Sequence, residues 1–568
     1  MTNDKKAAQA SLGRTFGIVA ILTVLSKVIG LARDVIVAHA YGTSIVADAY
    51  NYAYLFTGNI LILFGGLGGP FHSATVAILT PRKDDENSGR LLSQVFLFTF
   101  AALLIVSVAA YFLAPFLAEQ MAAGYKIIRD PGVLPPALQG LSDSALQNLL
   151  KKQIVEQFLI MLPLIVISGL VGISYGILNV YNRIFWPSLS PAIASIAIVI
   201  AIWGFTDPKT AAFTGIPLAV GTLIGALGQL VAQIPDMLKT RLKWGLSFKA
   251  MEGWNEYSAM IWPAIFSTSV GQLTVYVDAF FTRPLGQGAW TAILMSNRLV
   301  QLPLGVLLTA MLVPILPRFT EQVNLNKIDD LKDELRRSLR FLWFLALPLC
   351  ALFIAIPGPI IRLLFQHGEF TTNSTHEVSM ALLFLAPSIF FYVARDLMTR
   401  VFYAFKDSKT PFHVAVVAIV VKALLDWLFV YKAKLGVEAI SLASTLITMI
   451  NLSLLTMFLK KKIGQLGFGL LLKPLLIMLC ASLVCAGTAY LITESLSAET
   501  CIQMAGKVLP SMSKGIEFYF RLIVSTLALG LATGCGGILY FAVCLFFKLP
   551  EPSMLAARLP IVKKYLNK

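Results

Sequence analysis

Apolar residues run along the chain in blocks of about 20, bounded by charged residues or by glycine and proline. A helix of that length spans the hydrocarbon core of a bilayer. The second and last blocks are long enough to be tilted, broken or partly interfacial. The pattern predicts fourteen transmembrane helices, over residues 13–38, 45–79, 91–118, 153–180, 187–206, 211–237, 256–281, 289–316, 341–362, 378–404, 411–431, 435–459, 474–493 and 518–547.

Composition places the chain in the same class. The mean hydropathy is +0.76 and only 13% of the residues are charged, whereas soluble globular domains carry about 25% charged residues. The fold class is therefore an all-α polytopic membrane protein. Lys5, Lys6 and Arg14 precede the first apolar block without a small-residue cleavage site, so we expect a retained first helix rather than a removable signal peptide.

The net charge of +16 is explained by topology. If the N-terminus is cytoplasmic, lysine and arginine are in excess in the loops on that side, as the positive-inside rule requires. An even number of spans then leaves both termini cytoplasmic. No basic patch is interleaved with aromatic residues on a soluble face, so we expect contact with anionic membrane lipids and no nucleic acid.

The opening stretch has a counterpart later in the chain. Asp34 and Gly42 match Asp278 and Gly286, and Pro70 matches Pro314, each 244 residues further on. The interval spans six predicted helices, so the two copies have the same orientation. We expect two parallel-repeat six-helix lobes around a central cavity. The predicted domains are residues 1–240 (helices 1–6), residues 241–462 (helices 7–12), and two extra C-terminal helices in residues 463–568.

Charged residues inside apolar segments mark candidate sites, because each costs at least about 2.5–3.5 kcal/mol at bilayer depth. In the first helix, Lys27 and Asp34 share one face and Arg33 points about a third of a turn away. Arg298 lies in the predicted helix 289–316. If the three cations converge, they form a basic chamber suited to a phosphate or diphosphate. The alternative is local ion pairing, for instance of Lys27 with Asp34.

Glycines interrupt the second span. The stretch "NILILFGGLGGPF", residues 59–71, has four glycines and a proline within six residues. Such a stretch can unwind where it lines a cavity. It can equally allow tight helix packing through Gly65 and Gly69.

A second charged cluster lies in the other predicted lobe. Lys422 and Asp426 share a helix face at i and i+4, and Asp278 lies on helix 7. They suggest a coupling-ion or proton site, or else a salt bridge that staples helices 7 and 11. Arg395 and Asp396, in the inner half of helix 10, are candidates for a cytoplasmic gate or for snorkelling.

Three stretches, "SKVIGLARDVIVAHAYGTSIVADAY", "NRLVQLPLGVL" and "FYAFKDSKTP", closely resemble the MurJ (MviN) lipid II flippases of the multidrug/oligosaccharidyl-lipid/polysaccharide exporter superfamily. The similarity runs through all fourteen predicted helices. It implies outward flipping of the undecaprenyl-diphosphate-linked peptidoglycan precursor across the bacterial plasma membrane, by alternating access of two lobes. No cofactor is expected, and the chain is expected to be a monomer, with cell-wall synthesis proteins as candidate partners.

The resemblance also implies site residues. Positions matching Lys27, Arg33 and Arg298 line the central cavity of the family, and the acid matching Asp48 is functionally important. We hypothesise that Asp34 and Asp48 orient the cations or pair with them between turnovers. Helices 13 and 14 form a groove for the lipid tail in the family. Ile62 stands where members often have another cavity arginine. The full predicted substrate site is Lys27, Arg33, Asp34, Asp48, Asn59, Arg298 and Gln301.

Some members of the family bind sodium through acids and an amide on helices 7 and 11. Asp278 and Asp426 resemble two of those ligands, and Thr445 is a candidate third. One turn before Asp426, however, stands Lys422, whose ammonium would occupy a cation site. We therefore hypothesise that this chain binds no sodium there, and we expect no other metal.

Two rival functions follow from the same sequence. One is export of another polyprenyl-linked oligosaccharide or of drugs, although a drug-cation antiporter needs a net acidic cavity. The other is an enzyme acting on polyprenyl phosphates, which should carry an acid-rich or histidine-containing loop at the membrane face. The longest predicted outer loop, residues 119–152, has Glu119, Asp130 and Asp143 and no histidine or cysteine. We therefore expect a transporter and not an enzyme.

Overall fold

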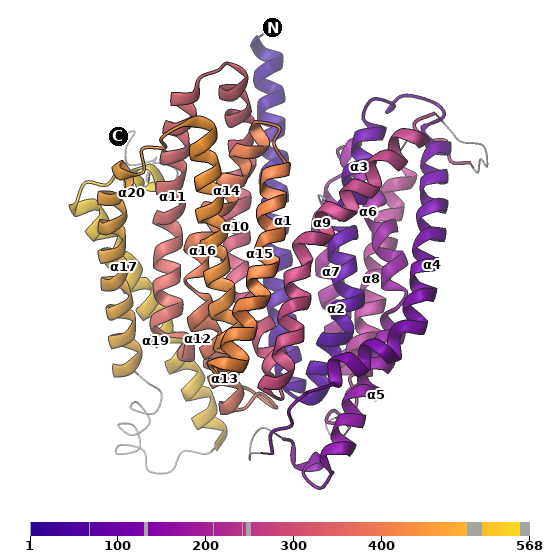
Figure 1. The fold of residues 1–568 in the computed structure, drawn as a ribbon, viewed down its shortest axis with the longest axis vertical. Helices are drawn as coiled ribbons and strands as arrows, with labels where there is room; N and C mark the ends of the chain where they lie inside the picture. Colours follow the sequence, from indigo (N-terminus) through magenta and orange to yellow (C-terminus); the bar gives the residue numbers. More distant parts are fainter. Residues whose placement is uncertain are drawn as a thin grey trace. The chain divides into compact units, whose positions relative to one another are not determined.

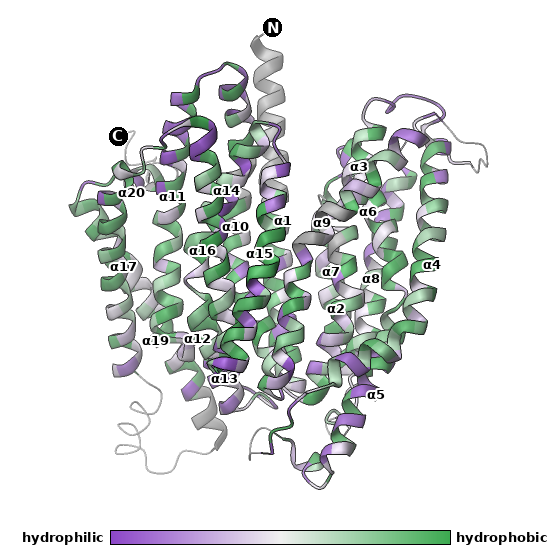
Figure 2. Ribbon diagram, viewed as in Figure 1, coloured by the Kyte–Doolittle hydropathy of each residue, from purple (hydrophilic) through white to green (hydrophobic). Residues whose placement is uncertain are grey.

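The computed structural model describes residues 2–66, 69–129, 134–207, 210–240, 242–245, 252–496 and 514–556. These residues form helices joined by turns and loops, with no extended strand among them (Figure 1). The predicted all-α class is thus confirmed. Among them, nine helices are long and apolar enough to cross a membrane, or ten if one bent pair is a single span. Apolar residues dominate these helices along most of their length (Figure 2).

The first compact unit comprises Met1–Thr291 and His367–Ser374. Within it α1 packs on α7 and α7 on α8, while α2 packs on α5 and α6, and α3 on α6 and α9. Its elements are α1 (Thr2–Tyr41), α2 (Ile45–Gly65), α3 (Pro70–Leu79), α4 (Ser88–Ala122), η1 (Pro136–Leu138), α5 (Asp143–Met161), α6 (Leu164–Val180), α7 (Phe185–Phe205), α8 (Ile216–Leu238), α9 (Trp254–Thr282), η2 (Arg283–Leu285) and the first three residues of α10 (Ala289–Asn324).

The second unit comprises Ala292–Gln366 and Thr375–Lys568. Here α17 packs on α19 and on α11. A hydrogen bond also joins α19 to α11, since the buried Tyr540 hydroxyl donates to the Phe344 carbonyl at 2.8 Å. Beyond the rest of α10, its elements are α11 (Ile328–Ala355), α12 (Pro357–Phe365), α13 (Thr372–Leu385), α14 (Ser388–Ala404), α15 (Lys409–Trp427), the π-helical turn η3 (Leu428–Lys432), α16 (Glu438–Ile463), α17 (Gly469–Ser495), α19 (Lys514–Phe546) and α20 (Pro550–Ala556).

The first unit continues past residue 240 because α9 packs on α2, α3 and α4. The three predicted domains follow the repeat rather than these packing contacts, and they stay a prediction.

The glycine-rich stretch of the second span does break the helix. α2 ends at Gly65 and α3 begins at Pro70. Gly65 also packs tightly, since a Cβ added there would lie 2.9 Å from the Ser168 carbonyl oxygen on α6. Interruption and close packing are therefore not alternatives here, because one glycine ends the helix and also permits the contact.

Two turns of the structure share one backbone geometry, at an interval that differs from the 244 residues of the sequence matches. The helices before Pro163 and Pro387 are both interrupted at the proline, and α6 and α14 then run for 17 residues each. The turns that follow place Asn182 and Lys406 at φ values of 57° and 56°. α7 and α15 begin three residues later in each case. The two turns are thus copies of one shape, 224 residues apart.

Only some of the residue matches at the interval of 244 residues have a counterpart in the structure. Gly42 and Gly286 both have positive φ, 55° and 117°, in the turns that precede α2 and α10. At Gly42 a side chain would also meet the Glu369 carbonyl oxygen. Pro70 and Pro314 differ, because Pro70 begins α3 whereas Pro314 lies inside the continuous α10. The register therefore drifts after the first turn of each copy.

An ion pair joins each of the two turns after α6 and α14 to the end of a later helix. Arg183 Nη1 lies 3.2 Å from Asp236 Oδ1 near the end of α8, and Asp407 Oδ2 lies 2.7 Å from Lys462 Nζ at the end of α16. Arg183 and Asp407 hold the same position in the two turns. The polarity of the pair is thus reversed between the copies.

Replacing Lys462 with alanine is expected to lower the free energy of unfolding by about 0.5–1 kcal/mol, as for other partly exposed ion pairs. Burial opposes ionisation of Asp407, but the bonds from Lys462 and Thr410 outweigh it and hold its pKa below the ordinary value. The contribution is therefore present near neutral pH and is lost as the pH falls through that lowered pKa.

Thermal unfolding in detergent would measure this loss. Lys460→Ala, an exposed lysine on the same helix turn, is the matched control, and the exchange Asp407→Lys with Lys462→Asp should restore stability. Equal effects of Lys462→Ala and Lys460→Ala would show that the pair contributes nothing.

Candidate functional site

Asp48, in the first turn of α2, is the centre of a buried polar network. Ser44 caps the helix by accepting from Ala47 N, and Asp48 follows with no exposed surface. Its carboxylate accepts hydrogen bonds from Gly288 N at 2.7 Å, Thr291 N at 3.0 Å and Thr291 Oγ1 at 2.6 Å. Tyr125 donates a fourth, at 2.8 Å. Asp48 therefore caps the N-terminus of α10, where free backbone N–H groups favour a negative charge.

The same end of the first unit is held by one backbone and one side-chain hydrogen bond. Glu369 N donates to the His39 carbonyl at 2.9 Å, and the hydroxyls of Thr43 and Ser374 lie 2.7 Å apart. Segment 367–374 thus packs against the turn between α1 and α2. Sequence reasoning selected Asp48 but missed its partners Tyr125, Gly288 and Thr291, because nothing local in the sequence links positions so far apart.

The three charged residues selected from the sequence on α1, Lys27, Arg33 and Asp34, divide into a pair and a single cation. Arg33 donates to Asp34 Oδ1 from Nη2 at 2.7 Å and from Nε at 3.0 Å, and Asp34 is buried. The sequence suggested an ion pair between Lys27 and Asp34, but in the structure Asp34 pairs with the adjacent Arg33. Lys27 is half-buried, and no hydrogen bond or ion pair to it is present among the described residues.

The other predicted substrate residues lie on α2 and α10. Asn59 is half-buried on α2, and Arg298 is half-buried and Gln301 exposed, one turn apart on α10 in the second unit. The side chain of Ile62 lies outside the described residues. Convergence of Arg298 with Lys27 and Arg33 stays a prediction.

The second cluster is a buried ion pair within one helix. Lys422 Nζ lies 2.6 and 2.8 Å from the two carboxylate oxygens of Asp426 and 3.5 Å from the Ile440 carbonyl oxygen, and both side chains are almost wholly buried. Thr445 Oγ1 donates instead to the Phe384 carbonyl at 2.7 Å. Asp278 lies on α9, in the first unit.

These residues do not fit a sodium ion. Both oxygens of Asp426 hold the Lys422 ammonium, and the Thr445 hydroxyl is engaged elsewhere. A sodium ion would have to displace a covalently tethered cation from its carboxylate, at close like-charge contact. We therefore assign no transport step to sodium.

Arg395 and Asp396 on α14, the predicted gate residues, form a salt bridge of 2.8 Å. The Arg395 guanidinium also lies 4.0 Å from the centre of the Tyr392 ring, a cation–π arrangement. Both side chains are about one quarter exposed. The pair is thus local to one helix, and its role as a gate stays a prediction.

Potential metal and disulfide chemistry finds no support in the described part of the chain. No group of three histidine, cysteine, aspartate or glutamate side chains there could hold a metal ion. The described cysteines, Cys350, Cys480, Cys485, Cys535 and Cys544, are free thiols. Cys501 lies outside the described residues.

Apolar helices of membrane-spanning length and ionisable side chains buried within them are typical of a multi-pass membrane transporter. Residues 37–505 match the family model described as "Lipid II flippase MurJ". The chain belongs to this family.

Relatives agree with the family match. A probable lipid II flippase MurJ of Synechocystis sp. is 32% identical over 470 residues, covering 81% of this chain and 83% of the relative. A lipid II flippase MurJ of Burkholderia cenocepacia is 26% identical over 423 residues, covering 72% of this chain and 76% of the relative.

Solved structures show the fold. A lipid II flippase MurJ in an inward closed conformation gives a TM-score of 0.70 at 24% identity, covering 93% of this chain and 98% of that structure. An outward-facing multidrug transporter of the MATE family gives 0.55 at 14% identity, covering 80% and 96%. The fold is therefore shared beyond the flippase family.

Proposed function

We propose that this protein is a lipid II flippase, which moves the undecaprenyl-diphosphate-linked disaccharide-peptide from the cytoplasmic to the outer leaflet by alternating access of two lobes. The observation that carries the proposal is the family match over residues 37–505. The single cation and the ion pair on α1 support it, because a diphosphate needs positive charge within an otherwise apolar bundle.

Lys27, Arg33 and Arg298 bind the diphosphate in this proposal, and Asn59 and Gln301 contribute polar contacts. Arg33 uses Nε and Nη2 on Asp34, yet a guanidinium has five N–H donors. It can therefore bind a phosphate oxygen while Asp34 still holds its orientation. Lys27 adds a point charge without first breaking an ion pair within the described chain.

The membrane potential favours export of this headgroup. Moving one negative charge outward across an inside-negative membrane gains about 2.3 kcal/mol per 100 mV. Two negative charges gain about 4–5 kcal/mol at that potential. The cations reduce the cost of dehydrating the diphosphate inside the closed cavity, while the lipid tail remains in the bilayer.

The proposed topology has fourteen transmembrane helices, two six-helix lobes and both termini in the cytoplasm of a bacterium. It places the Asp48 end of the first unit on the outer side of the plasma membrane. α17 and α19 carry the lipid-tail groove in this proposal. Exposed apolar side chains on both helices support this assignment, such as Leu483 on α17 and Ile538 on α19, which are 71% and 70% exposed. The protein acts as a monomer and meets cell-wall synthesis proteins, and the Arg395–Asp396 pair lies at its cytoplasmic gate.

Complementation of a flippase-depleted bacterium tests the proposal, with lipid II exposure on the outer leaflet measured alongside. The wild type should restore growth and exposure, and Arg298→Ala should lose at least about tenfold in exposure, since charge-assisted bonds contribute about 1.5–3 kcal/mol each. The control is Arg318→Ala, an exposed arginine on the same helix that pairs with Glu334.

Failure of a well-expressed wild type would move the substrate to another polyprenyl-linked oligosaccharide. Full activity of Arg298→Ala would leave the flippase proposal standing and remove Arg298 from the site.

A further inference from the structure

Residues 123–129 lie across the turn that joins η2 to α10 in the first unit. Tyr125 is 3% exposed and donates its hydroxyl to Asp48. The next residue, Lys126, donates its backbone N–H to the Arg283 carbonyl at 3.1 Å. Gly286 lies so close to Ile128 that an added Cβ would approach its Cδ1 atom to 2.6 Å. Three of the four residues 125–128 thus contact α2, η2 or the turn before α10.

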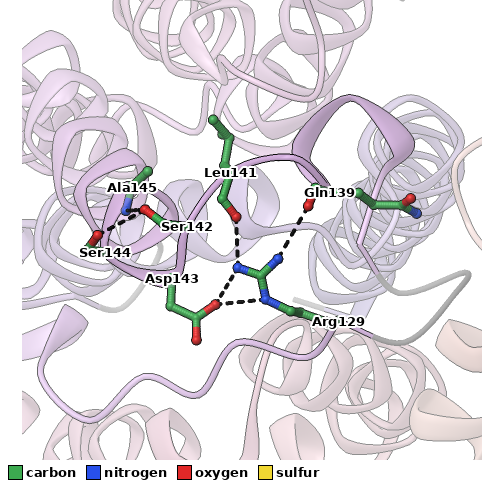
Figure 3. A network of polar contacts seen from close by, with 7 residues as sticks. All are labelled: Arg129, Gln139, Leu141, Ser142, Asp143, Ser144 and Ala145. Atoms are coloured by element: carbon green, nitrogen blue, oxygen red, sulfur yellow. Dashed lines mark hydrogen bonds and ion pairs between the residues drawn. The ribbon is translucent and has the colours of Figure 1, made fainter.

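Both ends of this segment are anchored to helices of the same unit. At its end, Arg129 donates to Asp143 Oδ1 at 2.6 and 2.9 Å and to the carbonyls of Leu141 and Gln139 at 2.7 and 3.3 Å (Figure 3). Asp143 begins α5, behind its capping residue Ser142. At its start the segment continues from α4, and Ala123 N donates to the Glu119 carbonyl in the last turn of that helix.

The Asp48 carboxylate therefore joins three separate parts of the chain. Gly288 and Thr291 supply three of its hydrogen bonds and belong to the turn and first residues of α10. Tyr125 supplies the fourth from the anchored segment. Burial and the nearby carboxylate raise the pKa of Tyr125 well above its ordinary value, so its hydroxyl keeps the proton that it donates.

We propose that residues 123–129 act as a strap that holds the start of α10 against α2, and that Tyr125 is the positioning residue through which the strap sets how often this end of the unit opens. The effect on opening rests on the proposed function, since an alternating-access flippase must open one end of its cavity. The strap itself is a local property that can be measured without lipid II.

Hydrogen–deuterium exchange of the purified full chain in detergent tests the strap. Tyr125→Phe removes one oxygen atom and should speed exchange of the peptide covering residues 286–292 by at least about tenfold, the effect of losing one bond to a charged acceptor. Exchange in α7 should stay unchanged. Tyr111→Phe is the matched control, because Tyr111 is 53% exposed on α4, the helix that precedes the strap.

A double-mutant cycle separates positioning from packing. If Tyr125 acts through Asp48, Tyr125→Phe should add little to the exchange rate of an Asp48→Asn variant, whereas a packing role gives additive effects. Arg129→Ala, at an exposed anchor, gives a second measurement if Tyr125→Phe does not fold, and it should raise exchange at residues 286–292 to a smaller extent.

Unchanged exchange at residues 286–292 in both Tyr125→Phe and Arg129→Ala would overturn the strap. Additive effects in the cycle would overturn the positioning role of Tyr125. If the wild type does not export lipid II in the complementation assay but the variants still change exchange as expected, the strap stands and the proposed function is wrong.

Discussion

Replacing Asp48 with alanine is expected to lower the free energy of unfolding by about 3–5 kcal/mol, because it leaves several buried donors without an acceptor. Asp48 has no exposed surface and accepts four hydrogen bonds. Its removal leaves the backbone N–H groups of Gly288 and Thr291 buried without an acceptor. Each such donor costs about 1–3 kcal/mol.

Equilibrium unfolding in detergent micelles measures this change. Asp48→Asn should cost less, because the amide keeps one acceptor oxygen of nearly the same shape. Glu256→Ala is the control, since Glu256 also lies in the first turn of a helix, α9, but its side chain is 62% exposed. An Asp48→Ala variant as stable as Glu256→Ala would show that the network does not hold α10 in place.

The second large effect concerns the Lys422–Asp426 pair. Either Lys422→Met or Asp426→Leu alone should lower the free energy of unfolding by about 3–5 kcal/mol, because each leaves an uncompensated charge in a buried site. The double variant should recover most of the loss, since replacing both members of a buried pair by apolar residues is often neutral or stabilising. A double variant as unstable as the sum of the two would contradict the pair as the source of the effect.

The same variants test the ion chemistry of the site. With the Lys422 ammonium on both oxygens of Asp426, sodium should leave the unfolding temperature of the wild type unchanged against potassium at equal ionic strength. A sodium-dependent rise that disappears in Asp426→Asn would show that the ion binds despite the lysine.

The all-α membrane class could be predicted from the sequence because its signal is local, whereas the number of fourteen spans stays a prediction beside the nine or ten membrane-capable helices of the described residues. Apolar blocks record the thickness of the bilayer, and glycine and proline mark breaks such as the one between Gly65 and Pro70. Lys422 and Asp426 could be paired from the sequence because i and i+4 positions adjoin on any helix.

Site geometry was less accessible to such reasoning. Lys27 and Asp34 share a helix face, so a helical wheel suggests that they pair. It does not show that the long side chain of Arg33, the adjacent residue, also reaches Asp34. Asp48 finds Tyr125 and Thr291 only through the packing of separate helices. Spacing along the chain carries no information about such contacts, so they could not be predicted from it.

The reversed polarity of the two ion pairs at the turns after α6 and α14 has a consequence for assembly in the membrane. Each turn meets the end of a later helix through one ion pair, and the two pairs have opposite polarity. Exchange of the two helix ends would set Arg183 beside Lys462 and Asp407 beside Asp236, which are like charges. The reversed polarity therefore disfavours such exchange while the chain folds in the membrane.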